Sequence, residues 1–314
     1  MRIHPIQLIL FFLAVQFSFA QTQQNKIYTD LEKIKNAVTF TAIGDWGRNG
    51  YYNQKETGSI LGETMNHIGG DFIVSVGDNF YPHGVGSTQD HHWLVSFENV
   101  YEHPGTWEDW YVILGNHDYN GNVQAQIDYS QISRRWHMPD RYYSKTIEDG
   151  NNKILLLFID TNPFVDSYLK HPEKKYSDVD AQDKNKQMTW IQKTLSESDA
   201  HWKIVIGHHQ LFTGGRRENA DNSVRTQLLP LFKQQNIDLY ICGHEHHLEY
   251  GVYEGIHQII SGAGSSVRVY NGTEGSVFGK SIQGFATVAI TQEAINFNFI
   301  DYLGNVIHAN KITK

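Results

Sequence analysis

The chain has 314 residues and a hydrophobic content of 40%, which is enough for one large domain or two small ones. Its formal net charge is −8, and no segment is rich in lysine and arginine. A protein that binds a nucleic-acid backbone needs a basic surface, so this charge balance argues against a nucleic-acid partner.

The first 20 residues have the pattern of a secretory signal peptide. Arg2 precedes a mostly apolar stretch over residues 6–19, and Ser18-Phe19-Ala20 offers small residues at the positions that a signal peptidase reads. The stretch is short and contains two glutamines, whereas a membrane span needs about 20 apolar residues. We expect cleavage near Ala20, a secreted or periplasmic location and no membrane span. A buried N-terminal helix is the alternative.

The chain contains one cysteine, so we expect no internal disulfide. Cys242 lies in the apolar run 238–242, which predicts a buried thiol rather than a reactive one. The fold must therefore be held by its core and, we expect, by bound metals.

Strand-like and helix-like segments alternate along most of the chain. Helical spacing of apolar residues predicts helices over residues 53–68, 90–103, 123–136, 181–198 and 223–235. The turn pair Asp149-Gly150 predicts a hairpin between strands at 142–148 and 153–161. After His247 the pattern changes to short strands, at residues 256–261, 285–291, 294–302 and 306–312.

Five apolar runs end in glycine followed at once by a residue type that binds metals. These ends are Gly44-Asp45, Gly77-Asp78, Gly115-Asn116-His117, Gly207-His208 and Gly243-His244-Glu245-His246. Short runs rich in β-branched and aromatic residues that stop at a breaker are typical of buried strands. Because ligands of open α/β sheets lie beyond the carboxyl ends of the strands, we expect these side chains to meet at one edge.

The same pattern predicts the α/β (α+β) fold class, with two mixed β-sheets packed as a sandwich and helices on the outer faces. We expect residues 21–314 to form a single domain in which the β-rich C-terminal end completes the second sheet. The sequence leaves the oligomeric state open, and a monomer is the expectation.

The residue types at the strand ends favour a pair of metal ions. Aspartate and asparagine supply hard oxygen ligands, and histidine supplies an imidazole, which suits zinc, iron and similar ions. On an extended segment, residues two apart point to the same side, so His244 and His246 can reach neighbouring ions. Such a pair of ions clamps the attacking and leaving oxygens of a phosphoryl displacement, and Asp78 is the candidate bridging carboxylate.

With these motifs the chain resembles the metallophosphoesterases, and within them the small purple acid phosphatases of the tartrate-resistant type. The resemblance covers nearly all of residues 38–300 and includes Gly77-Asp78-Asn79-Phe80-Tyr81 and Gly115-Asn116-His117-Asp118. The wider superfamily has Asp-x-His at the first motif, where this chain has Asp45-Trp46-Gly47. Tyr81, three residues after Asp78, takes the place of that histidine in purple acid phosphatases.

The resemblance implies two metal sites. The first is formed by Asp45, Asp78, Tyr81 and His246, and the second by Asp78, Asn116, His208 and His244. The first site collects two carboxylates and a phenolate, and three anionic ligands favour Fe(III). The second site has one shared carboxylate and otherwise neutral ligands, which suits Fe(II), Zn(II) or Mn(II). If His247 were a metal ligand, the ligand positions of the last motif would shift along the chain. The pair His244 and His246 fits the family's motif better.

The resemblance also implies a secreted acid phosphatase that hydrolyses small phosphate monoesters by in-line attack of a metal-bound hydroxide. His117 is the leading candidate for the general acid, with Asp118 as its orienting partner. Mammalian-type members have a second histidine nine positions after the ligand equivalent to His208, and this chain has Arg217 there. Candidate substrate contacts are Arg216, Arg217 and His209.

Two other functions stay open from the sequence. The same metal platform serves phosphodiesterases and nucleotide pyrophosphatases, and the loops at 84–90 and 214–222 would shape an open groove for a diester. A non-catalytic phosphate- or metal-binding protein is the second alternative, although the intact ligand set and His117 argue against it.

Overall fold

The computed structural model describes residues 29–150, 152–170, 176, 178–217 and 222–314. The predicted signal peptide lies outside these residues. Within them, no helix combines the length and the apolar character that a membrane crossing requires.

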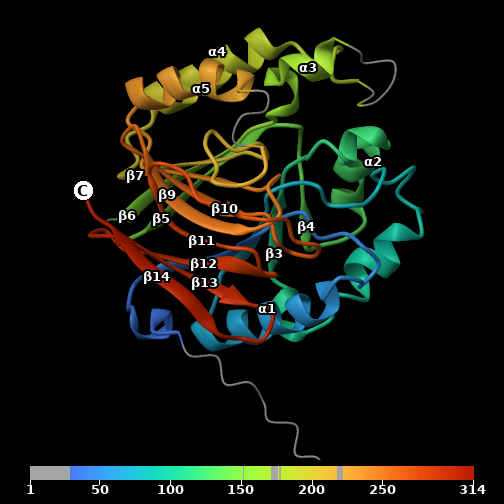
Figure 1. Ribbon diagram of the computed structural model, residues 1–314, viewed down its shortest axis with the longest axis horizontal. Helices are drawn as coiled ribbons and strands as arrows, with labels where there is room; N and C mark the ends of the chain where they lie inside the picture. The colour runs from blue at the N-terminus through green and yellow to red at the C-terminus, as the bar shows by residue number, and fades with distance from the viewer. Residues whose placement is uncertain (1–28, 151, 171–175, 177, 218–221) are drawn as a thin grey trace, which may run out of the picture.

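Two seven-stranded sheets form the centre of the molecule (Figure 1). The first has the strand order β14-β13-β12-β1-β2-β3-β4. Its strands are β1 (Val38–Ile43), β2 (Phe72–Ser75), β3 (Asp109–Val112), β4 (Trp136–His137), β12 (Gly284–Ile290), β13 (Ile295–Asp301) and β14 (Val306–Ile312). Because β1, β2 and β3 run parallel, their carboxyl ends reach the same edge of the sheet.

The second sheet has the strand order β11-β9-β10-β8-β7-β6-β5. Its strands are β5 (Tyr143–Asp149), β6 (Asn152–Phe158), β7 (Trp202–Ile206), β8 (Leu239–Cys242), β9 (Leu248–Tyr253), β10 (Ile256–Ser261) and β11 (Ser276–Lys280). Here β6, β7 and β8 run parallel, so the Gly-His turns that follow β7 and β8 also leave from one edge.

The sheets pack face to face around an apolar core. Alternate residues of β1, including Phe40 and Ala42, share this core with Leu156 of β6 and Ile204 of β7. All six residues of β1 are buried, because helices cover the outer face of its sheet as well. Burial on both faces explains why these strands have continuous apolar runs rather than alternating ones.

Helices form the outer layers of the sandwich, as the sequence predicts (Figure 1). Helix α1 (Gln54–Ile68) packs on the first sheet through Leu61 and Met65. Helices α4 (Lys184–Glu197) and α5 (Ser223–Gln234) cover the second sheet through Ile191 and Leu228. Two further helices, α2 (Val123–Asp128) and α3 (Asp166–Leu169), are short.

The helices predicted at 53–68, 181–198 and 223–235 are confirmed to within a few residues. Two other helix predictions are wrong in extent. Residues 90–103 contain only a wide π-helical turn at Trp93–Glu98. The helix predicted at 123–136 ends at Asp128 and is followed by a 3-10 turn at Tyr129–Gln131, and Trp136 belongs to β4, where it pairs with Trp110.

The C-terminal strands also differ from the prediction that they complete the second sheet. Only β9, β10 and β11 join that sheet, whereas β12, β13 and β14 extend the first. Strand β12 pairs antiparallel with β1, with Val38 opposite Ile290. Short apolar strands carry no local signal for their partner strand, so the hydrophobic pattern predicts the strands but not the sheet that they join.

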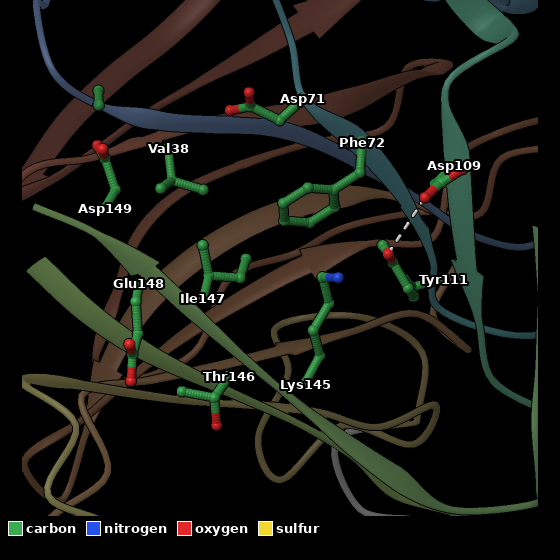
Figure 2. Close-up of a pocket in the computed structure, with 11 residues that line it drawn as sticks. Val38, Asp71, Phe72, Asp109, Tyr111, Lys145, Thr146, Ile147, Glu148 and Asp149 are labelled. Carbon is green, nitrogen blue, oxygen red and sulfur yellow. Dashed lines mark hydrogen bonds between the residues drawn. The ribbon is translucent and has the colours of Figure 1, made fainter.

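A cavity of about 660 Å³ opens at the amino ends of β1, β2 and β3 (Figure 2). Two of its acidic side chains have partners within the fold. The Oδ2 atom of Asp71 accepts a 2.7 Å hydrogen bond from the N–H of Thr39, and Asp109 lies 2.9 Å from His137. The predicted metal ligands follow the carboxyl ends of the strands, so this cavity is not part of their site.

Candidate metal centre

Three of the predicted ligands have a left-handed backbone. The φ angle is 59° at Asp45, 52° at Asp78 and 67° at His244. Residues other than glycine rarely adopt this conformation, and such strain is concentrated at functional sites. Each of the three directly follows a strand-ending glycine, so the turn itself directs the side chain away from the strand.

The glycines allow the strand ends to approach one another closely. A Cβ atom on Gly115 would lie 2.2 Å from Oδ1 of Asp78, and one on Gly243 would lie 2.5 Å from Oδ2 of Asp45. Both distances are far shorter than any real Cβ contact. These two glycines are therefore required for the close approach of the carboxylates rather than for a positive φ.

A first cluster of buried side chains surrounds the hydroxyl of Tyr81. This oxygen lies 2.9 Å from Oδ1 of Asp45, 2.8 Å from Oδ2 of Asp78 and 3.2 Å from Nε2 of His246. The Nε2 atom of His246 lies 3.3 Å from Oδ1 of Asp45. The four side chains predicted for the first metal site therefore converge.

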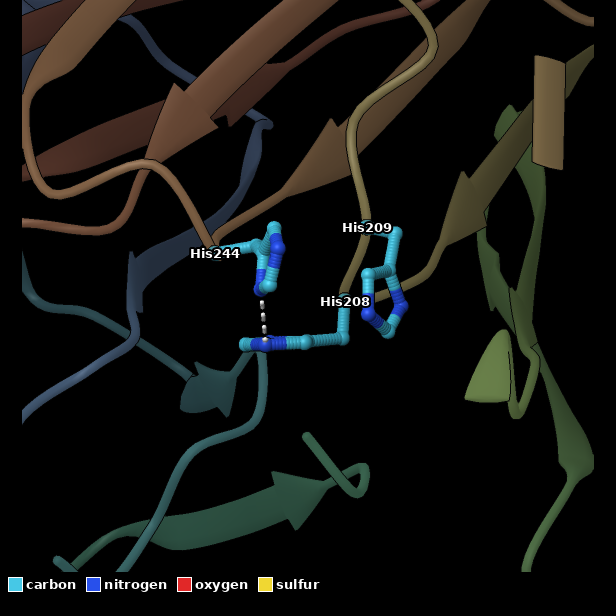
Figure 3. Close-up of side chains that lie close together, drawn as sticks. All are labelled: His208, His209 and His244. Carbon is cyan, nitrogen blue, oxygen red and sulfur yellow. Dashed lines mark hydrogen bonds between the residues drawn. The ribbon is translucent and has the colours of Figure 1, made fainter. Parts of the chain in front are cut away.

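A second cluster contains His208 and His244 (Figure 3). The Nε2 atom of His208 lies 3.2 Å from Nδ1 of His244 and 3.5 Å from Oδ1 of Asp78. The Nδ1 atom of His208 lies 2.8 Å from the carbonyl oxygen of Val76, and a carbonyl only accepts. Nδ1 of His208 therefore carries the proton, and Nε2 is the nitrogen that faces the cluster.

Asp78 faces both clusters with different oxygens. Its Oδ2 accepts from Tyr81 in the first cluster, whereas its Oδ1 lies towards His208 in the second. The ligand atoms of Asp45, Asp78 and His208 lie within 4.8 Å of one another, as do those of His208, His209 and His244. Two adjoining groups of metal-ligating side chains thus form a dinuclear centre.

The surroundings of Asn116 indicate that a cation fits this arrangement. Its Oδ1 atom is buried and has no hydrogen-bond partner among the described residues. A buried polar oxygen without a partner is costly, and coordination of a cation removes that cost. Asn116 lines the same cavity as His244, which agrees with its predicted place in the second site.

The electrostatics of the centre also suit cation binding. Burial raises the pKa of Tyr81 well above its usual value, and the charges of Asp45 and Asp78 add to this effect. Burial opposes ionisation of Asp78, but His208 and His117 together hold its pKa below the usual range. Burial, followed by the charges of His209 and Arg217, lowers the pKa of His244. The site therefore presents an ionised carboxylate at Asp78 and a neutral imidazole at His244.

His117 lies beside the centre on the Asn116 loop. Its backbone N–H donates a 2.7 Å hydrogen bond to Oδ1 of Asp78, and its Nδ1 lies 2.7 Å from the carbonyl oxygen of Pro82. Asp118 is fully buried and accepts hydrogen bonds from the backbone N–H groups of Asn79 and Gly115. These bonds hold the loop of Asp78 to the loop that carries Asn116 and His117.

His209 and His247 are close to the predicted ligands but face other partners. The ring of His209 lies 4.4 Å from that of His244, yet its Nδ1 lies 2.7 Å from Oγ1 of Thr161 and its Nε2 lies 3.0 Å from the hydroxyl of Tyr168. His247 is fully buried and bonds Glu249 at 2.7 Å through Nε2. Of the histidines in the last motif, His244 and His246 therefore lie at the centre, whereas His247 faces Glu249.

A cavity of about 420 Å³ opens beside the second cluster. It is lined by Asn116, His117, Val165, Ser167, Tyr168, Tyr176, His209, Gln210, Arg217, Val224 and His244. Of the two candidate arginines, Arg217 lines this cavity, whereas Arg216 is exposed and is not among its lining residues. Two of the three candidate substrate contacts, His209 and Arg217, thus face the same space.

Sequence reasoning missed several charged residues around the centre. The guanidinium of Arg48 lies 3.6 Å above the ring of Tyr81, Glu245 pairs with Arg217 at 2.7 Å, and Arg268 donates to the carbonyl of His244. Arg48 follows the first motif by three residues and Glu245 lies inside the last motif, so both have a positional signal. Nothing in the sequence distinguishes Arg268.

The comparisons with known proteins agree with this geometry. The family model for calcineurin-like phosphoesterases matches residues 38–248. Purple acid phosphatase 7 of Arabidopsis thaliana is 32% identical over 100% of this chain and 98% of that protein. Tartrate-resistant acid phosphatase type 5 of Sus scrofa is 32% identical over 88% of this chain and 87% of that protein.

Two solved structures have the same fold. GAP50, described as the anchor in the inner membrane complex of Plasmodium, matches with a TM-score of 0.75 and 26% identity, over 88% of this chain and 89% of that one. The purple acid phosphatase PPD1 from yellow lupin matches with a TM-score of 0.66 and 16% identity, over 88% of this chain and 54% of that one. On the family model and the near full-length relatives, the chain belongs to the calcineurin-like phosphoesterases and, within them, to the purple acid phosphatases.

Proposed function

We propose that this protein is a dinuclear metal-dependent acid phosphatase that hydrolyses small phosphate monoesters. The observation that carries the proposal is the position of Asp78, whose two oxygens face two different clusters of metal-ligating side chains. A carboxylate between two cations offsets their mutual repulsion, and a pair of cations is the device that clamps a phosphoryl group during in-line displacement.

The proposed ligand sets follow the two clusters. Asp45, Asp78, Tyr81 and His246 hold one ion, and Asp78, Asn116, His208 and His244 hold the other. The first set contains three groups that are anionic when they bind a metal, which favours Fe(III). The second set has one shared carboxylate and neutral ligands, which suits Fe(II), Zn(II) or Mn(II).

When bound, the metal pair supplies Lewis-acid activation of water and of the phosphoryl oxygens. The residues of the chain would hold the metal ligands in the correct orientation and supply a proton to the leaving group. The carbonyl of Val76 fixes the tautomer of His208, so that Nε2 faces the site. The carbonyl of Pro82 accepts the proton of Nδ1 of His117 in a hydrogen bond, so proton exchange takes place at Nε2. We assign His117 as the general acid that protonates the leaving alcohol.

The test uses the metal-loaded protein with 4-nitrophenyl phosphate and bis(4-nitrophenyl) phosphate at acidic pH. Faster hydrolysis of the monoester supports the proposal, and removal of the metals with a chelator should abolish turnover. A preference for the bis-ester would instead assign the protein to the phosphodiesterases on the same metal platform.

A non-catalytic role is the second candidate, and one specific observation favours it. The chain is 26% identical to GAP50, whose description is that of an anchor. Protein that binds two metal ions and phosphate but turns over neither ester would support the non-catalytic role. The position of His117, whose N–H bonds the carboxylate that faces both clusters, supports the catalytic one.

We further propose that residues 1–20 are a signal peptide, that residues 21–314 form one catalytic domain and that this domain is a secreted or periplasmic monomer. Arg2, the apolar stretch at residues 6–19 and the small residues before the expected cleavage site support export. N-terminal sequencing of the mature protein should begin near Gln21, and size-exclusion chromatography should give the mass of one chain. An intact Met1 or a larger assembly would contradict these assignments.

A further inference from the structure

We propose that Arg48 is a positioning residue that acts through Tyr81. Its guanidinium, packed on the phenol ring, attracts negative charge of the proposed phenolate ligand and so keeps the ion of the first site a strong Lewis acid. Arg48 lies in the loop between β1 and α1, and Tyr81 lies in the loop after β2. The inference rests on the proposed function, because it assigns a role within the same metal centre.

The guanidinium of Arg48 covers a face of the Tyr81 ring. Its Cζ atom lies 3.6 Å from the ring centroid, well inside the distance of about 6 Å within which an aromatic face attracts a cation. The ring of Tyr52 is the second aromatic neighbour, with its centroid 5.7 Å from the same atom. Tyr81 is buried, so little water screens the closer contact. Of the two tyrosines, the proposed metal ligand is therefore the one that the charge of Arg48 affects more.

Hydrogen bonding does not account for the position of the Arg48 side chain. Its Nε atom is buried and has no hydrogen-bond partner among the described residues. The two carboxylates that flank the Tyr81 hydroxyl, those of Asp45 and Asp78, face that hydroxyl and the imidazoles of His246 and His208. A buried donor without a partner is costly. The contact with the ring of Tyr81 is the interaction that offsets this cost.

The backbone around Arg48 is anchored to the segment that carries Tyr81. The N–H of Tyr81 donates a 2.8 Å hydrogen bond to the carbonyl of Gly47, and a Cβ atom on Gly47 would lie 1.8 Å from the carbonyl oxygen of Asn79. On its other side, the N–H of Arg48 donates to Oε1 of buried Gln54 at 2.9 Å. Because the two segments are fixed to each other, the fold itself brings the guanidinium to the ring.

The charges around Tyr81 give this contact its effect. The hydroxyl oxygen of Tyr81 lies 2.9 Å from Asp45 and 2.8 Å from Asp78, and two carboxylates repel the charge of a phenolate. A guanidinium over the ring attracts the part of that charge which is delocalised into the ring. Arg48 thus withdraws electron density from the bond that Tyr81 would make with Fe(III). An ion that receives less charge from its ligands polarises a phosphoryl oxygen more strongly.

The experiment measures the position of the phenolate charge-transfer band in the iron-loaded protein. Arg48→Met removes the charge and keeps an unbranched side chain, whereas Arg48→Lys keeps the charge. Loss of the cation raises the energy of the phenolate electrons, so the band maximum of Arg48→Met should move to longer wavelength. The expected shift is on the order of 10–40 nm, the effect of one unit charge about 4 Å away at an effective dielectric constant of about 20. Arg48→Lys should restore part of this shift.

The rate of hydrolysis provides a second readout. Arg48→Met should lower kcat for 4-nitrophenyl phosphate by about two- to tenfold, the range expected for a partly desolvated cation–π contact. Arg134→Met is the matched control, since it removes an exposed arginine whose guanidinium donates to the carbonyl of Trp107. It should change neither the band maximum nor kcat.

Band position also distinguishes this role from a purely structural one. A variant that folds poorly or loses iron loses band intensity, but the maximum of the remaining protein does not move. An unshifted maximum in Arg48→Met would therefore overturn the proposal. Arg48→Gln is a second variant without the charge. If both uncharged variants lose iron, retention of iron by Arg48→Lys supports the role of the charge, and loss of iron from all three contradicts it.

Turnover separates this inference from the proposed function. A shifted maximum in a protein without phosphatase activity supports the inference and contradicts the proposed function. Normal turnover with an unshifted maximum removes the inference alone. If the unaltered protein binds iron without showing the band, the inference is overturned together with the assignment of Tyr81 as a ligand, and hydrolysis of 4-nitrophenyl phosphate still decides the proposed function.

Discussion

The backbone N–H of His244 donates a 2.9 Å hydrogen bond to Oδ2 of Asp45, which lies 199 residues away in the chain. Asp45 follows a strand of the first sheet, and His244 follows a strand of the second. With Oδ2 engaged in this way, Oδ1 is the oxygen that faces Tyr81 and His246. The orientation of one predicted metal ligand is therefore set by the packing of the two sheets.

Replacing the proposed phenolate ligand should remove the colour of the oxidised protein. We expect the iron-loaded protein to be purple or pink, because a phenolate bound to Fe(III) gives a charge-transfer band. Tyr81→Phe should lose this band, since no other phenol lies between Asp45 and Asp78 among the described residues. The absorption spectrum checks this. Tyr168→Phe, which removes a hydroxyl bonded to His209 instead, should keep the colour, and a coloured Tyr81→Phe protein would refute the assignment.

Removing the amide of Asn116 should empty one of the two metal sites. Its Oδ1 has no protein partner in the described part of the chain, so Asn116→Ala costs no internal hydrogen bond of that oxygen. We expect the metal content to fall from two ions per chain to one, with little change in the melting temperature of the metal-free protein. Elemental analysis measures this, with the exposed Asn99→Ala as control. An unchanged content of two ions would rule out Asn116 as a ligand.

Loss of the proposed general acid should depend on the leaving group. His117→Gln should reduce kcat by roughly 10²–10⁴ for alkyl phosphates, the usual contribution of general acid catalysis, and by much less for 4-nitrophenyl phosphate, whose leaving group needs little protonation. A series of esters with graded leaving-group pKa values measures the effect. His83→Gln, an exposed histidine in the preceding loop, is the control. Equal slowing of all esters would show that His117 has another role.

The close approach at Gly115 should be sensitive to a single methyl group. In Gly115→Ala the new Cβ would overlap the backbone and carboxylate of Asp78, at 2.2 Å from each of their nearest atoms. We expect a loss of about 1–3 kcal/mol in the free energy of unfolding together with weaker metal binding. Gly86→Ala is the matched control, because its nearest neighbour would lie at 3.4 Å. Thermal denaturation with and without metal measures both effects, and wild-type behaviour of Gly115→Ala would contradict this account.

The sequence predicts the strand ends well because each signal is local. An apolar run, a glycine and a polar residue lie next to one another in the chain, and the parallel order of β1, β2 and β3 then brings the ends together. The approach of Asp45 and Asp78 follows from this order, whereas the orientation of the Asp45 carboxylate depends on His244 of the other sheet. Their roles as ligands, and that of His117 as an acid, remain predictions that the experiments above address.

What the sequence could not provide is information about partners distant in the chain. The pairing of β12 with β1 and the capture of Trp136 by the first sheet depend on tertiary packing, which overrides local propensity. The meeting of Arg217 and Arg268 at the carbonyl of His244 is of the same kind, since the sequence marks the position of Arg217 in the Gly-His motif but nothing in it singles out Arg268 as its neighbour. Charged residues on loops are typical of solvated surface, and the loop of Arg268 has no other pattern in the sequence.

The insertion of β12 beside β1 has a consequence for shortened forms of the protein. The region that the family model matches ends at residue 248, before β12 begins. A fragment cut there would leave one side of β1 without its hydrogen-bonded neighbour, and an apolar strand with an open edge recruits other chains. Every sequence motif would be intact in such a fragment, yet it should aggregate rather than fold into a smaller enzyme.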